Sequence, residues 1–93
     1  MSDSECSEDS KIEERRKIAI RCNEEGCRLL EKNKNEEARR LFKLAIEFSP
    51  NSFEYHYNSA LTFYKLNRLD ESIEATLKCI ELEPEVVIGY MLK

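Results

Sequence analysis

The stretch NKNEEARRLFKLAIEFSP at residues 33–50 recurs in altered form as NRLDESIEATLKCIELEP at residues 67–84. Each copy opens on an asparagine, continues with acidic and then apolar residues, and ends on a proline, Pro50 or Pro84. Apolar residues at spacings of three and four are typical of one face of a helix, and proline cannot extend a helical hydrogen-bond ladder. Each copy therefore predicts an amphipathic helix that ends just before its proline.

A second helical pattern precedes each copy. Apolar residues three or four apart over about residues 11–33, and an aromatic-rich stretch over residues 53–66, each predict a helix. Turn-forming residues at 33–35 and 67–68 separate the helices of each pair. When the two halves of the sequence are aligned, the paired side chains have similar size and polarity. Examples are Gly26 with Ala60, Glu37 with Glu71, Ala45 with Cys79, Ile46 with Ile80 and Pro50 with Pro84. We therefore expect an all-α fold built from two helical hairpins.

This pattern resembles the tetratricopeptide-repeat (TPR) family, whose repeat of about 34 residues is a helix-turn-helix hairpin. The offset between the two copies equals that repeat length. Gly26 and Ala60 match the small residues at which the two helices of such a hairpin cross. Ala38, Phe42 and Ala45 match the family pattern in the second helix of the first repeat. The resemblance implies a fragment of a right-handed α-solenoid, with two full repeats and the start of a third.

The resemblance also divides the chain into segments. The two hairpins are expected at about residues 19–52 and 53–84, with the first helix extended towards the N-terminus to about residue 11. Residues 1–10, MSDSECSEDS, are mostly serine and acid without apolar periodicity, and we expect them to be a disordered acidic tail. Residues 85–93 are expected to begin a third repeat or to form a capping helix. Their apolar character differs from the polar outer face of a cap, which favours a longer protein.

Composition narrows the classes of function. The 93 residues carry a net charge of -4, whereas nucleic-acid binding rests on basic side chains that displace counterions. No stretch reaches the roughly 18–20 consecutive apolar residues of a membrane span. The four cysteines form no CxxC pair and stand with a single histidine, His56, so no metal site is expected. We expect no cofactor, nucleic acid or membrane as ligand, and cysteines in helical patterns favour a reducing compartment, cytoplasmic or nuclear.

Candidate partner-binding residues follow from the resemblance, which places the first helix of each hairpin on the concave face of the solenoid. Tyr57, Leu61 and Tyr64 lie on one helical face, and tyrosine is enriched in binding hot spots. The alternative is that this stripe packs between helices. The expected set is Asn23, Cys27, Leu30, Glu54, Tyr57, Asn58, Leu61, Tyr64 and Lys65, with Ile20, Glu24 and Glu31 on the same face of the first helix.

A well-known ligand class of the family is the acidic C-terminal tail of heat-shock chaperones, which a clamp of lysine, asparagine, asparagine, lysine and arginine holds by its carboxylates. In this sequence Asn58 matches one of those asparagines. The other clamp positions carry Asn23, Cys27, Ile88 and Leu92. Because the cations that would neutralise a carboxylate are missing, we expect this chain not to bind such a tail.

Three hypotheses for function compete. The first is a module that binds a partner peptide or domain through the concave face, as the N-terminal part of a co-chaperone-like or regulatory scaffold or adaptor. The second is a substrate-recruiting domain of a larger enzyme, such as a ubiquitin ligase or methyltransferase. The third is self-association through the apolar residues of segment 86–92, Val87, Ile88, Tyr90, Met91 and Leu92. We expect no catalytic residues in this chain, which has neither a glycine-rich phosphate loop nor a nucleophile dyad.

Overall fold

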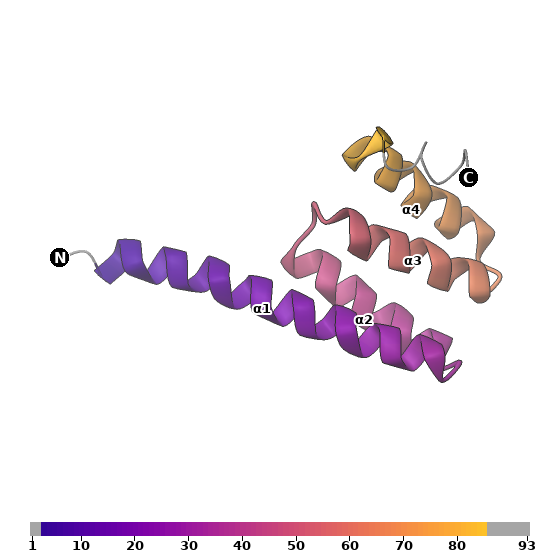
Figure 1. Ribbon diagram of the computed structural model, residues 1–93, viewed down its shortest axis with the longest axis horizontal. Helices are drawn as coiled ribbons and strands as arrows, with labels where there is room; N and C mark the ends of the chain where they lie inside the picture. The colour runs from indigo at the N-terminus through magenta and orange to yellow at the C-terminus, as the bar shows by residue number, and fades with distance from the viewer. Residues whose placement is uncertain (1–2, 86–93) are drawn as a thin grey trace.

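The computed structural model describes the backbone of residues 3–85 and the side chains of residues 10–85. This part of the chain consists of helices joined by turns, which confirms the expected all-α fold (Figure 1). The helices are α1 at Asp3–Glu31, α2 at Asn35–Phe48, α3 at Phe53–Lys65 and α4 at Leu69–Leu82. Helices α1 and α2 form one hairpin, and α3 and α4 form the next, with α3 lying between α2 and α4 (Figure 1).

The turn inside each hairpin has the same geometry. Asn33 and Asn67 adopt the left-handed conformation, with φ of 63° and 64°. After α1, the amide of Lys34 donates to the carbonyl of Leu29 at 2.8 Å, while the Asn33 amide donates to the carbonyl of Leu30 at 2.9 Å. These are the two hydrogen bonds of a Schellman cap, in which asparagine tolerates the positive φ. The amides of Arg68 and Asn67 repeat them on Phe63 and Tyr64.

The first hairpin is held by close approach of small residues to one large ring. Ala38, Phe42 and Ala45 of α2 are fully buried, as is Ala19 of α1. A Cβ atom added to Gly26 would lie 2.6 Å from Cε1 of Phe42, closer than real Cβ contacts come. Gly26 is therefore the position that lets α1 cross α2 over the Phe42 ring.

The two hairpins share part of this core. Ala19 of α1, Ala45 of α2 and Tyr55 of α3 form one buried cluster. The Arg15 guanidinium lies 4.9 Å from the centre of the Phe48 ring at the edge of the same cluster. Tyr55 therefore joins the second hairpin to both helices of the first.

The outer surface of α4 carries a stripe of exposed apolar side chains, namely Leu69, Ile73, Leu77 and Ile80. The shift between the two repeats aligns this stripe with Asn35, Arg39, Lys43 and Ile46 of α2. On α2, the last three of those positions line the space next to α3. The stripe on α4 is thus the surface that would meet a following helix. Residues 85–93 were expected to begin a third repeat or to form a capping helix. Residues 86–93 lie outside the described residues, and they include Val87, Ile88, Tyr90, Met91 and Leu92.

The N-terminal segment differs from the expectation of disorder over residues 1–10. Helix α1 begins at Asp3, well before the expected start near residue 11, and its N-terminal half projects beyond α2 (Figure 1). The segment contains neither glycine nor proline, so nothing in the sequence stops the helix that continues from residue 11. Extending an existing helix costs far less than nucleating one, which accounts for the earlier start.

Gly26→Ala is expected to lower the free energy of unfolding by about 1–2 kcal/mol, because the overpacking of Phe42 outweighs the gain in helix propensity. Urea denaturation followed by circular dichroism measures the change. In the background of Phe42→Leu, the same substitution should cost less, since the smaller side chain leaves room for the added methyl group. A Gly26→Ala variant as stable as the wild type would contradict this account of the helix crossing.

Candidate functional site

Three of the predicted partner-binding residues meet between α1 and α3. The side-chain amide of Asn58 donates from Nδ2 to Oδ1 of Asn23 at 2.8 Å and lies 3.7 Å from Sγ of Cys27. Asn23 is only 8% exposed, and Asn58 and Cys27 are half-buried. These residues form a polar floor that fixes α3 against α1.

Carboxylates surround this floor. Burial raises the pKa of the Cys27 thiol, and the negative charges of Glu54, Glu31 and Glu24 raise that pKa further. Glu24 and Glu31 come from α1 and Glu54 from α3, and all three are exposed. The surface above the floor therefore carries negative potential.

Apolar and aromatic side chains lie on the same face and are exposed to solvent. Tyr64 is 66% exposed and Leu61 38%, and Ile20 of α1 is also exposed. Tyr57 is exposed as well, and its ring stacks on Phe53 with centroids 6.1 Å apart. The stripe is thus accessible rather than packed between the described helices. We call these exposed side chains, the polar floor and the three glutamates the α1–α3 face.

The other predicted residues of the face are placed as follows. Leu30 of α1 is half-buried, whereas Glu54 and Lys65 lie exposed towards opposite ends of α3. The α1–α3 face therefore includes the predicted residues other than Leu30 and Lys65, and the role of the whole set in partner binding stays a prediction. From the sequence, Asn58 was matched to one asparagine of the carboxylate clamp, and its hydrogen bond with Asn23 was not foreseen. Glu24 and Glu31 were expected on the same helical face as Cys27, but their effect on the pKa of its thiol was not foreseen.

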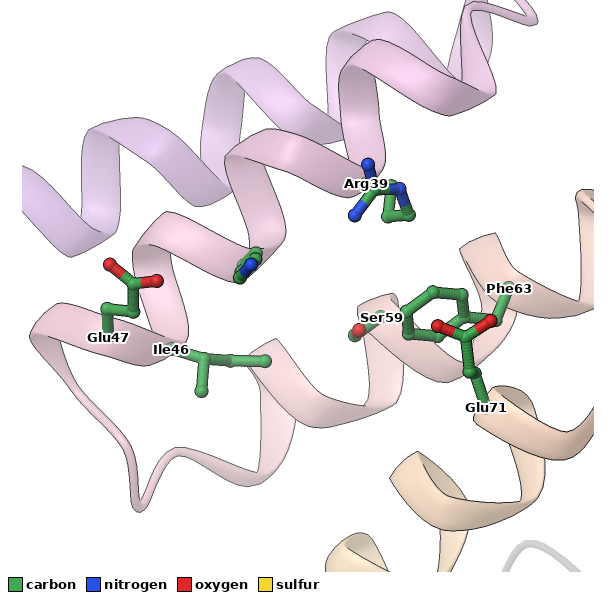
Figure 2. A pocket seen from close by; sticks show the side chains of 7 residues that line it. Arg39, Ile46, Glu47, Ser59, Phe63 and Glu71 are labelled. Carbon is green, nitrogen blue, oxygen red and sulfur yellow. The ribbon is translucent and has the colours of Figure 1, made fainter. Parts of the chain in front are cut away.

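A hollow lies on the side of α3 that faces away from the α1–α3 face. It encloses about 380 Å³ and is lined by Arg39, Lys43, Ile46 and Glu47 of α2, Ser59 and Phe63 of α3 and Glu71 of α4 (Figure 2). Two of its four charged side chains are positive and two are negative. One of the positive ones, Arg39, donates to the carboxylate of Glu36 at 2.6 Å. This hollow follows the seam between the hairpins and offers no net charge to select a ligand.

Two features are absent from the described residues. Among them, no group of three or more histidine, cysteine, aspartate or glutamate side chains is arranged to hold a metal ion. None of the helices over residues 3–85 combines the length and the apolar character that crossing a membrane requires.

Comparison with known proteins supports the sequence resemblance. One family model, described as TPR repeat, matches residues 26–67, and another, described as tetratricopeptide repeat, matches residues 53–86. Hsp70-Hsp90 organizing protein 3 of Arabidopsis thaliana is 34% identical over 76 residues, which cover 82% of this chain and 14% of that protein. Hsp70-Hsp90 organizing protein of Triticum aestivum is 31% identical over 77 residues, 83% of this chain and 13% of that protein. The chain thus spans a small part of the length of these relatives.

Asn58→Ala is expected to cost about 1–2 kcal/mol of unfolding free energy, because it leaves Oδ1 of Asn23 without its donor at a largely buried position. A double-mutant cycle with Asn23→Ala isolates the interaction free energy of the two side chains, with the stability of each variant measured by urea denaturation. We expect a coupling free energy of about 0.5–1.5 kcal/mol. Strictly additive losses would show that the hydrogen bond does not join the helices.

The Cys27 thiol is expected to react with iodoacetamide only at a higher pH than an unfolded cysteine. Burial and the neighbouring glutamates disfavour the thiolate, which is the reactive form, so the pH midpoint of alkylation shifts upward with the pKa. Mass spectrometry of the Cys27 peptide gives this midpoint, and the same peptide in the urea-unfolded chain is the control. Glu31→Gln/Glu54→Gln should lower the midpoint without reaching the unfolded value, since burial remains. A folded midpoint at or below the unfolded one would contradict the described environment.

Proposed function

We propose that this chain, which belongs to the tetratricopeptide-repeat family, is a protein-interaction module that binds a segment of a partner protein on its α1–α3 face. The observation that carries the proposal is the exposure of Leu61 and Tyr64 beside a floor fixed by the Asn23–Asn58 hydrogen bond. Exposed apolar side chains grouped on one surface are typical of interaction sites. A rigid floor beneath them lowers the entropy lost on binding.

The relatives support a role in a larger assembly. Both relatives are named Hsp70-Hsp90 organizing proteins, and this chain resembles a small part of each. We therefore propose a co-chaperone-like scaffold or adaptor context for the module. This similarity does not identify the partner, because related repeats bind different ligands through different side chains.

The chemistry of the described cysteines favours binding over catalysis. The described cysteines Cys22, Cys27 and Cys79 are free thiols, and burial raises the pKa of each. A catalytic cysteine needs the opposite shift, towards the thiolate. We accordingly propose a non-catalytic module, and a reducing compartment, cytoplasmic or nuclear, stays a prediction for it.

Leu61→Ala/Tyr64→Ala should reduce capture of the partner by about tenfold or more, because truncating two side chains in a binding hot spot removes most of its energy. The measurement is a pull-down from lysate with quantitative mass spectrometry, followed by titration of the purified partner. Ile73→Ala/Leu77→Ala is the matched control, since these two side chains of α4 are 58% and 59% exposed and lie off the face.

Circular dichroism of both variants must first show wild-type helicity, so that a lost partner reports on the surface and not on unfolding. A partner retained by the face variant and lost by the α4 variant would move the site to the apolar stripe of α4. That result would refute the proposal.

A further inference from the structure

The carboxylates of the α1–α3 face take part in no ion pair in the described part of the chain, and three of them lie around one floor. Some glutamates elsewhere pair with a basic residue three positions away on the same helix, as Glu25 does with Arg28 and Glu81 with Lys78. Among the described side chains, no ion pair engages Glu24, Glu31 or Glu54. These carboxylates therefore leave a negative charge that a ligand could neutralise.

The residues around these carboxylates suit a cation better than an anion. Lys65 is the one basic residue expected on the face, and no ion pair joins it to the three glutamates in the described part of the chain. The exposed ring of Tyr64 offers an aromatic surface, and aromatic rings attract lysine and arginine side chains. The chain itself uses this contact, with the Arg68 guanidinium 5.4 Å from the centre of the Phe63 ring.

The same floor is poorly suited to an acidic ligand. The Nδ2 group of Asn58 already faces Asn23 and Cys27, so its donors are turned into the protein. Asn23 and Cys27 carry no charge that could neutralise a carboxylate. An acidic segment laid over this floor would also meet Glu24, Glu31 and Glu54, and like charges in proximity oppose binding.

We propose that the α1–α3 face selects a protein segment in which lysine or arginine side chains alternate with apolar ones. This inference rests on the proposed function, because it names the class of ligand for the same face. The basic side chains lie against the glutamates and over the Tyr64 ring, while the apolar side chains contact Ile20 and Leu61. Charge complementarity of this kind gives specificity and speeds association, and salt weakens it.

The test uses two fluorescein-labelled peptides with the same alanine and leucine residues, one carrying lysines and the other carrying glutamates at the same positions. Fluorescence anisotropy at low salt measures the affinity of the whole chain for each. We expect the lysine peptide to bind at least about tenfold more tightly, and added sodium chloride to weaken that binding.

Glu31→Gln/Glu54→Gln should weaken binding of the lysine peptide by about tenfold, because it removes two of the three charges of the face. Glu37→Gln/Glu74→Gln is the matched control, with the same change in net charge at exposed glutamates of α2 and α4. Binding that weakens equally in both variants would overturn the inference, since it would report only the overall charge of the chain.

The remaining outcomes separate this inference from the proposed function. Tighter binding of the glutamate peptide would overturn the basic-segment inference and leave the face as a binding site. If neither peptide binds while capture of the natural partner still depends on Leu61 and Tyr64, the face binds a ligand of another kind and the inference falls alone. If capture does not depend on those residues either, both proposals fall.

Discussion

The packing of Gly26 against Phe42 is the contact on which the rest of the structure depends. It fixes how closely α1 crosses α2, and the fully buried Ala19 and Ala45 extend the same close interface. Tyr55 of the second hairpin packs on Ala19 and Ala45, so the first hairpin determines where the second one lies. The α1–α3 face exists only because this chain of contacts holds the two helices side by side.

The two helices of the second hairpin are also held close together, but by different contacts. The positions equivalent to Gly26 and Phe42 carry Ala60 and Thr76, a small residue opposite a much smaller side chain. In place of a buried ring, the Ser72 hydroxyl donates to the carbonyl of Ala60 at 2.9 Å and so links α4 to α3. Cys79 is the one buried residue of α4, whereas α2 buries Ala38, Phe42 and Ala45. In repeat proteins such a unit relies on its neighbours, and here α3 packs against α2.

The sequence predicted features that local chemistry determines. Asn33, Asn67 and the two prolines marked the ends of helices correctly, because left-handed turns and broken ladders depend on single residues. The start of α1 was not predictable in this way, since no residue before position 11 stops a helix. The Asn23–Asn58 hydrogen bond joins two residues that are far apart in the sequence. Its existence depends on how α1 and α3 lie against each other, and no local pattern encodes that.

Charge is where this chain departs from what its family resemblance implies. The fold determines which positions are exposed between α1 and α3, but the ligand is selected by the side chains that occupy them. Here Glu24, Glu31 and Glu54 surround a neutral floor, and the clamp positions in that floor, Asn23, Cys27 and Asn58, provide no cation for an acidic tail. Similarity to Hsp70-Hsp90 organizing proteins therefore supports a shared fold, and it does not identify the ligand of this chain. The electrostatics of the face are the better guide to its partner, because reversing the sign of a few charges changes the ligand without changing the fold.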